Sequence, residues 1–219
     1  MSDSVKAFNG IAESYEDWYR QPRGAQVLQS ELLGLETLLP ASGTGFEVGA
    51  GTGIFAQQLT SGDRVVLCLD QSPRMLKRAR AKGLDAVLAA AEWFPLRRGS
   101  LDFVFMVTTI EFLNDPVAAL RSIGSSLKKG SPIVVLAINR DSKWGELYVR
   151  LGLSGDHIFR HARIYRIGEL KSMLGEAGFV VSDEVGILTK GPDEPEEEIN
   201  ILERVEGAGA VLFRAFRKS

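Results

Sequence analysis

The chain has 219 residues, of which 45% are hydrophobic and 25% charged, and its formal net charge is −2. This length and composition fit one globular domain with a substantial core, and the mildly acidic balance argues against a general nucleic-acid binder, which usually carries a basic excess. No apolar stretch is long enough to span a bilayer and no segment resembles a signal peptide, so we expect a cytoplasmic protein that does not contact membranes. The single cysteine, Cys68, excludes an intrachain disulfide and lies in an apolar run typical of a core.

Two amphipathic segments open the chain. Residues 4–20 place aromatic and aliphatic side chains at intervals of three and four, which predicts a helix. A break at Gln21-Pro22 separates this segment from a second predicted helix over residues 24–39. Both segments precede the first predicted strand, so they could cap the turn that follows that strand.

The most informative stretch is residues 46–59. An apolar run ends in three glycines at alternate positions, Gly49, Gly51 and Gly53, and apolar residues then recur at helical spacing, which predicts a strand, a tight turn and a helix. Glycine reaches positive φ without steric cost and lets a ligand approach the backbone closely. The first turn of a helix adds unpaired N–H groups and the positive end of the helix dipole. The stretch therefore predicts a nucleotide-like ligand, and a turn that only packs a helix on a sheet is the alternative.

The glycine spacing separates two kinds of nucleotide site. The dinucleotide fingerprint G-x-G-x-x-G needs its third glycine where this chain has Ile54. With Glu47 two places before Gly49, the pattern here is E-x-G-x-G-x-G, which resembles the cofactor motif of class I S-adenosylmethionine (SAM) dependent methyltransferases. The resemblance implies SAM as cofactor and S-adenosylhomocysteine as its product. It places cofactor contacts at Glu47, Gly49, Ala50, Gly51 and Gly53.

An acidic residue ends the next predicted strand, residues 64–70. Asp70 lies roughly 20 residues past the glycines, the spacing at which an acidic side chain accepts hydrogen bonds from ribose hydroxyls. The alternative role, capping of the predicted helix over 74–82, is already supplied by Ser72 and Pro73. Under the resemblance, Gln71 and Met75 flank the adenine.

The segment after the third predicted strand, residues 85–90, resembles the family's third signature, usually G-D-A-E-x-L-P-F. In the family, the alanine backbone and the preceding acidic side chain hold the edge of the adenine. Here Ala90 takes the acidic position, so one adenine contact is missing, while Ala91 and Glu92 match. Trp93 is expected either to pack on the adenine ring or to be a surface aromatic.

The aromatic residues of the N-terminal segment divide into two groups. We interpret Phe8 and Ile11 as core residues. Tyr15 and Tyr19 suit a position with one dry side and one polar ligand. In methyltransferases similar to this chain, a Tyr-x-x-Trp-aromatic segment closes over the cofactor, so both tyrosines are candidate cofactor contacts.

The rest of the chain alternates strands and helices, which predicts a parallel sheet covered on both faces. Strands are predicted over 101–109, 132–138, 180–188 and 208–216, with helices over 116–127 and 168–177. The fold class expected is α/β, a Rossmann-like doubly wound seven-stranded sheet with an antiparallel last strand. We divide a single methyltransferase domain, 1–219, into a helical cap (1–40), a cofactor-binding core (41–139), a lid inserted after the fifth strand (140–167) and a C-terminal helix with strands (168–219). The acidic segment 193–198 is expected to be a solvated loop or the first turn of a short helix.

Direct methyl transfer needs little from the protein besides positioning, because the sulfonium of SAM is already an excellent donor. The resemblance therefore leaves a general base optional. Thr108, at the end of the fourth strand, is a candidate cofactor contact. Glu111, just past the fourth strand, is a candidate base or substrate ligand, with a solvated loop carboxylate as the alternative. His157 is a second candidate.

A local excess of arginine in the lid suggests an anionic small-molecule acceptor, with Arg163 as the preferred ligand. The alternative is a solvated helix face. His157 and His161 lack an acidic or cysteine partner, so no metal is expected. Two other functions stay open, an NAD-dependent oxidoreductase and a non-catalytic SAM-binding protein, and the chain could be a monomer or a homodimer.

Overall fold

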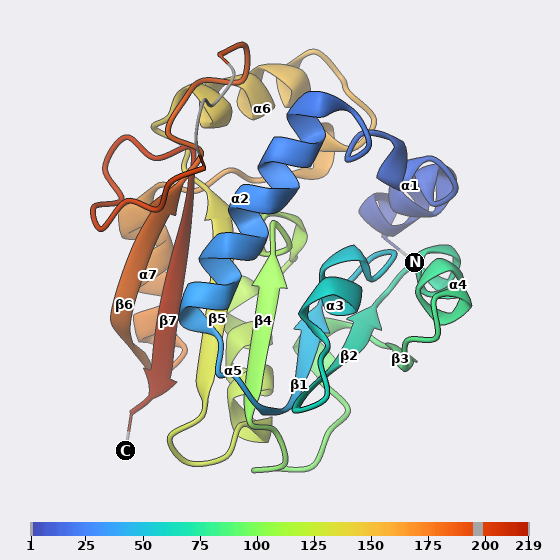
Figure 1. The fold of residues 1–219 in the computed structure, drawn as a ribbon, viewed down its shortest axis with the longest axis vertical. Helices are drawn as coiled ribbons and strands as arrows, with labels where there is room; N and C mark the ends of the chain where they lie inside the picture. The colour runs from blue at the N-terminus through green and yellow to red at the C-terminus, as the bar shows by residue number, and fades with distance from the viewer. Residues whose placement is uncertain (1, 195–198, 219) are drawn as a thin grey trace.

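The computed structural model describes residues 2–194 and 199–218 and contains one seven-stranded sheet in the order β3-β2-β1-β4-β5-β7-β6 (Figure 1). The strands β1 to β5 pair in parallel, and β7 pairs antiparallel with both β5 and β6. The predicted doubly wound sheet with an antiparallel last strand is confirmed. The strands are β1 Gly43–Val48, β2 Arg64–Asp70, β3 Ala86–Leu88, β4 Phe103–Val107, β5 Pro132–Ile138, β6 Phe179–Ile187 and β7 Ala210–Arg217.

Helices cover both faces of the sheet (Figure 1). The side chains of α2, α3 and α4 pack in one hydrophobic cluster, and those of α5 and α7 pack in the other. The α-helices are α1 Asp3–Ile11, α2 Pro22–Leu38, α3 Ile54–Leu59, α4 Pro73–Ala81, α5 Pro116–Ser126, α6 Lys143–Leu153 and α7 Ile167–Glu176. Short 3-10 turns are η1 Tyr15–Asp17, η2 Ala91–Trp93, η3 Ile110–Phe112 and η4 Phe159–His161.

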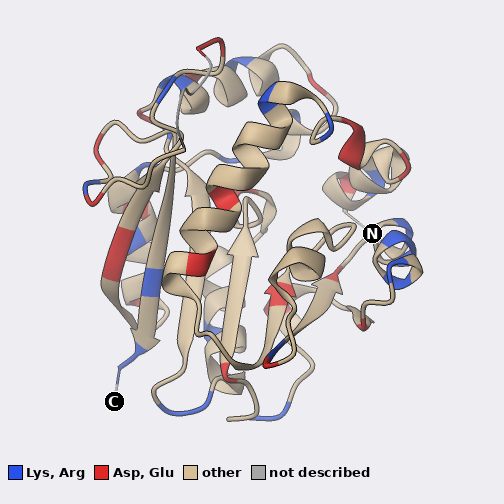
Figure 2. Cartoon of the chain, in the orientation of Figure 1, with Lys and Arg blue, Asp and Glu red and all other residues tan. Residues whose placement is uncertain are grey.

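The central strands are apolar because they are buried on both faces. All five residues of β4 and six of the seven in β5 are buried, as expected for parallel strands between two helical layers. Neither strand carries a Lys, Arg, Asp or Glu, and Figure 2 shows charges of both signs spread over the outer helices and loops. Cys68 is fully buried in this core.

The helices α4 and α5 begin with a side-chain cap, and the cap at Ser72 was predicted. The Ser72 hydroxyl accepts a hydrogen bond from Met75 N at 3.2 Å, and the Asp115 carboxylate accepts one from Ala118 N at 2.9 Å. Each cap satisfies a backbone donor that the helix itself leaves free. Both caps stand next to a proline at the first helical position.

The N-terminal segment differs from the single helix predicted over 4–20. The helix α1 ends at Ile11, and Ser14 N donates to Ile11 O at 3.0 Å to close a turn before η1. Asn9 and Gly10 have low helix propensity, which favours the break. The chain therefore folds back toward α2 instead of continuing straight. The predicted acidic loop at 193–198 lies largely outside the described residues.

Candidate functional site

A cavity of about 620 Å³ lies over the carboxyl ends of β1, β2, β4 and β5. Its other walls come from α1, η1, α2 and α6, and Figure 1 shows α6 and the start of α2 beyond the arrowheads of β4 and β5. The volume falls in the range of about 300–1,000 Å³ found for small-molecule sites. Open α/β sheets place their ligands at this edge, where the strand order reverses on either side of β1.

The three motif glycines in the turn after β1 have two different roles. All three have positive φ, at 71° for Gly49, 54° for Gly51 and 73° for Gly53. A Cβ on Gly49 would lie 2.3 Å from the hydroxyl of Thr109, and one on Gly53 would lie 2.4 Å from Leu84. A Cβ on Gly51 would meet nothing closer than Met75 Sδ at 4.0 Å. Gly49 and Gly53 therefore allow close packing, whereas Gly51 faces open space in the cavity.

Asp70 holds the glycine turn from the neighbouring strand. Its Oδ2 accepts from Gly51 N at 2.8 Å and its Oδ1 accepts from Ser72 N at 2.7 Å. Burial raises the pKa of Asp70, although hydrogen bonds from three backbone N–H groups oppose that shift. The carboxylate lines the cavity and its two oxygens offer about four acceptor positions, so capacity remains for a ligand hydroxyl.

Glu47 lies behind the turn and does not line the cavity. Its Oε2 accepts from Ala56 N at 2.9 Å in the first turn of α3, and burial raises its pKa to about 8. Ala50 and Gly53 also lie outside the cavity wall. These three motif residues support the turn without lining the cavity.

Four other predicted contacts line the cavity near the turn: Gln71, Met75, Ala91 and Thr108. Thr108 has a φ of 43°, a conformation that is uncommon outside glycine and often marks functional sites. Glu92 and Trp93 do not line the cavity, and the Trp93 side chain is 82% exposed. Trp93 is therefore the surface aromatic of the two alternatives.

The N-terminal aromatic residues form one wall of the cavity. Tyr15 and Tyr19 both line it, with ring centroids 6.0 Å apart, and Tyr19 also contacts Phe55 of α3 at 6.1 Å. Phe8 and Ile11, which we interpreted as core, are only partly buried and line the same cavity. That interpretation is wrong because α1 packs across the cavity instead of against a hydrophobic layer.

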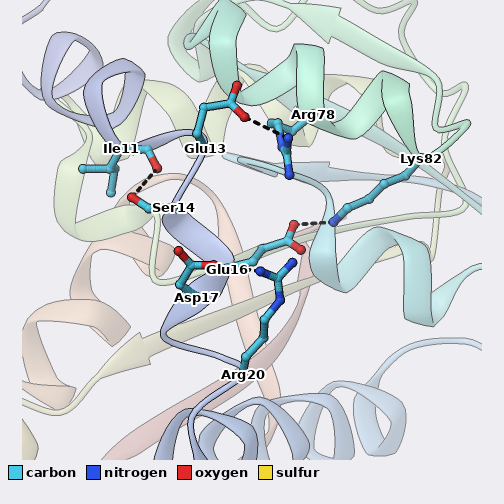
Figure 3. Close-up of polar contacts among 8 residues, drawn as sticks. All are labelled: Ile11, Glu13, Ser14, Glu16, Asp17, Arg20, Arg78 and Lys82. Atoms are coloured by element: carbon cyan, nitrogen blue, oxygen red, sulfur yellow. Dashed lines mark hydrogen bonds and ion pairs between the residues drawn. The ribbon is translucent and has the colours of Figure 1, made fainter.

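The N-terminal segment is attached to α4 by charged and polar contacts. Figure 3 shows Glu13 paired with Arg78, at 2.9 Å, and Glu16 paired with Lys82. Burial opposes ionisation of Glu16, yet its pKa is lowered because Lys82 donates to it and pairs with it. One turn earlier, the Ser72 hydroxyl donates to Asn9 Oδ1 at 2.8 Å. The segment is thus fixed to the same helix that follows Asp70.

Two buried carboxyl groups, Glu31 of α2 and Glu111 of η3, line the cavity away from the glycine turn. Each residue is 3% exposed, and each has an Oε2 atom without a hydrogen-bond partner. Glu111 Oε1 accepts from Ile138 N at 2.9 Å. Glu111 is therefore not the solvated loop carboxylate that we had considered as its alternative.

Glu31 is the functional candidate that sequence reasoning missed. It lies between Val27 and Leu35 at intervals of four on the buried face of α2. A carboxyl group on an otherwise apolar helix face is unusual because burying it is costly. This pattern in the sequence could have identified Glu31 as a candidate site residue.

The arginine and histidine side chains of the predicted lid, residues 140–167, do not line this cavity. His157 is exposed, and the Arg163 side chain is 70% exposed, lies 3.6 Å from Glu169 and sits over the ring of Tyr165 at 5.0 Å. Arg163 points outward because its neighbour Ile164 fills the buried position. The structure therefore places the arginine excess of the lid on the solvated face, as in the alternative interpretation.

The described residues contain neither a metal cluster nor a membrane-spanning helix. Residues 2–194 and 199–218 contain no group of three or more His, Cys, Asp or Glu side chains that could hold a metal ion. Within the same ranges, no helix combines the length and apolar character needed to cross a membrane.

Comparison with known proteins agrees with this geometry. The family model of a methyltransferase domain matches residues 46–135, from the end of β1 through most of β5. The solved structure of a SAM-dependent methyltransferase from Thermotoga maritima, described as a possible histamine N-methyltransferase, superposes with a TM-score of 0.89 and 32% identity. The match covers 98% of this chain and 100% of that one. The chain belongs to the SAM-dependent methyltransferase family.

Two curated relatives of this methyltransferase show how far the likeness extends. An uncharacterized protein of Mycobacterium tuberculosis is 32% identical to this chain. The match covers 78% of this chain and 59% of the length of that relative. A ubiquinone biosynthesis O-methyltransferase of Xanthomonas axonopodis is 26% identical, with 84% of this chain and 74% of that protein covered. The family membership decides against an NAD-dependent oxidoreductase and implies SAM as the cofactor.

Proposed function

We propose that this methyltransferase transfers a methyl group from SAM to a small-molecule acceptor that enters the same cavity. The observation that carries the proposal is the continuity of that cavity. One space is lined both by the glycine turn with Asp70 and by side chains of α2 and α6. A cofactor and a small acceptor can therefore meet inside the protein.

The residues near β1 and β2 fit an adenosyl group. Gly51 leaves open space beside the backbone, and Asp70 keeps acceptor positions for ribose hydroxyls. Met75 and Ala91 are apolar surfaces suited to the adenine ring. When bound, SAM supplies a methyl group on a positively charged sulfur, whose C–S bond breaks as the bond to the acceptor forms, leaving the electron pair on sulfur.

In this proposal, the protein positions the cofactor and the acceptor and keeps water away from them. The aromatic wall of Tyr15 and Tyr19 covers one side of the cavity, and α6 covers another. Trp144 of α6 is fixed by donation from its Nε1 to Lys190 O at 2.8 Å. Holding two reactants in a fixed geometry can supply about 7–11 kcal/mol of a reaction barrier. We propose residues 1–40 as the cap and 140–167 as the lid that provide this enclosure.

The names of the relatives guide the choice of acceptors to test. One relative is named an O-methyltransferase and another a possible N-methyltransferase. Small phenols and small amines are therefore the first two acceptor classes to test with this chain.

The test is turnover measured as S-adenosylhomocysteine formed from SAM, detected by mass spectrometry, with a panel of phenols and amines. We expect product with at least one acceptor and none without the protein. Binding of S-adenosylhomocysteine without any turnover across the panel would favour the non-catalytic SAM-binding alternative. Failure to bind either SAM or S-adenosylhomocysteine would overturn the proposal.

A further inference from the structure

We propose that the acceptor is a small nitrogen base that binds as a cation between Glu31 and Glu111, and that Glu111 takes up its proton. The inference rests on the proposed function and deepens it by naming the acceptor class. It replaces the anionic acceptor expected from the arginines of the lid.

The two carboxyl groups come from distant parts of the chain and share one cavity. Glu31 lies on α2 and Glu111 follows β4, and both are 3% exposed with an unpartnered Oε2. A buried carboxylate without a partner is strongly destabilising, and a bound cation is the ligand that removes this penalty. Glu111 is held in place through its other oxygen by Ile138 N. Its unpartnered oxygen is therefore positioned for a ligand.

The charge balance of the cavity wall favours a cation. Among the described residues that line the cavity, Arg23 is the one Lys or Arg. Its Nη2 donates to Gly191 O at 2.6 Å, and its guanidinium sits 5.1 Å from the centre of the Trp144 ring. The acidic residues that line the same wall are Glu31, Asp70, Glu111, Asp156 and Asp193.

Aromatic rings complete this part of the cavity. Tyr148 of α6 lies between Trp144, at a centroid distance of 6.1 Å, and Phe159, at 4.5 Å. All three line the cavity. The faces of such rings attract cations, most strongly where water is excluded. Carboxylates together with aromatic faces select a positively charged, partly apolar molecule.

The two carboxyl groups titrate near neutral pH. Burial raises the pKa of Glu111 to about 7, against the hydrogen bond from Ile138 N, and burial followed by repulsion from Glu111 raises the pKa of Glu31 to about 8. Three tyrosines, Tyr15, Tyr19 and Tyr148, face them in the cavity, and the charge of Glu31 adds to burial in raising the pKa of each. The other titratable residues of the cavity wall are Arg23, Asp70, Asp156 and Asp193. On the other side of Glu111, a smaller hollow is lined by Asp3, His161, Arg163 and Tyr165.

A proton transfer to Glu111 makes the nitrogen reactive. An ammonium N–H gives its proton to the ionised carboxylate, which becomes neutral, and the N–H bonding pair stays on nitrogen as a lone pair. That lone pair is the nucleophile for the methyl displacement described above, and the methylated nitrogen then carries the positive charge. Glu111 returns its proton to solvent when the product leaves. A base with a pKa near 7 suits this exchange at neutral pH.

The first experiment compares matched triplets on several skeletons, for example phenethylamine, 2-phenylethanol and phenylacetate, by calorimetry with S-adenosylhomocysteine bound. We expect the amine to bind at least about tenfold more tightly than its alcohol or acid, since a charge-assisted contact replaces a neutral one. Glu31→Gln and Glu111→Gln should each reduce this preference, and the double variant should abolish it. Arg150→Ala, an exposed arginine of α6 that lines neither hollow beside Glu111, is the control and should keep the preference.

Two readouts separate this inference from the proposed function. Amine binding at pH 7 should release protons, seen as an enthalpy that depends on the buffer, and the double variant should lose the release. S-adenosylhomocysteine should bind all variants with similar affinity, so loss of that binding would count against the cofactor site instead. The inference is overturned if alcohols or acids bind as tightly as amines, if no amine on any skeleton binds, or if the double variant still prefers amines.

Discussion

The two ends of the cavity are built in opposite ways. We call the end formed by the glycine turn the cofactor end, because we propose that SAM binds there. At this end, Asp70 already accepts hydrogen bonds from the backbone N–H groups of Gly51 and Ser72. At the other end, which we call the acceptor end because we propose that the acceptor binds there, Glu31 and Glu111 each keep a buried oxygen without a partner. The first end is shaped by local backbone before any ligand arrives, whereas the second carries an electrostatic cost that a ligand can relieve. Substitutions at the first end should therefore lower cofactor affinity, whereas substitutions at the second should change how stability depends on pH.

The largest effect is expected at Gly51. In Gly51→Val, the branched side chain would project into the cavity and would be strained at a φ of 54°. We expect S-adenosylhomocysteine affinity measured by calorimetry to fall by at least about 100-fold. Gly62→Val is the matched control, because a Cβ there meets nothing within 4 Å and φ is not in the left-handed region. Equal affinities for Gly51→Val and the wild type would place the cofactor elsewhere.

A smaller loss is expected for Asp70→Ala. Loss of a single hydrogen bond from a ribose hydroxyl to a charged acceptor costs roughly 1.5–3 kcal/mol, so affinity for S-adenosylhomocysteine should fall at least about 10-fold. The variant also frees the N–H groups of Gly51 and Ser72, so its melting temperature should be measured alongside. The exposed Asp85, at the edge of the same sheet, gives the control Asp85→Ala. A folded Asp70→Ala protein with wild-type affinity would remove Asp70 from the site.

At the acceptor end, stability without ligand should depend on pH. The pKa of Glu31 rises from 4.5 to about 8 on folding, so its contribution to stability is fully present below pH 4.5 and is lost as the pH rises through 8. The free energy of unfolding should fall by at most about 1.4 kcal/mol per pH unit for this carboxyl in that window. Glu31→Gln should flatten the slope measured by urea denaturation. An identical slope in the variant would mean that Glu31 is not buried as described.

The smallest effect is expected where the N-terminal segment attaches to α4. Lys82→Gln breaks the pair with Glu16, in which each side chain is 18% exposed. Exposed pairs contribute roughly 0.2–1 kcal/mol, and we expect this more sheltered pair to contribute about 1 kcal/mol. Affinity for S-adenosylhomocysteine should fall about two- to fivefold at low salt, and less at high salt, where charges are screened. The exposed pair Asp3–Lys6 supplies the control Lys6→Gln. An equal effect of both variants would show that the attachment to α4 does not matter for the cofactor.

The sequence predicted one end of the cavity better than the other, and the reason is physical. Gly51 and Asp70 belong to short strand–turn–helix units, in which residue spacing alone brings side chains to one sheet edge. Glu31 and Glu111 share the cavity only because α2 packs against the sheet. A local sequence pattern does not predict that packing. Arg163 was misplaced because composition shows that a segment is basic and not which way its side chains point.

The most direct test of the account is a crystal structure of the protein with S-adenosylhomocysteine. We predict that the ribose hydroxyls donate to Asp70, that the adenine lies beside Met75 and Ala91, and that the region between Glu31 and Glu111 stays available for an acceptor. A ligand bound away from Asp70, or one whose homocysteine group fills the space between the two glutamates, would contradict the division of the cavity into a cofactor end and an acceptor end.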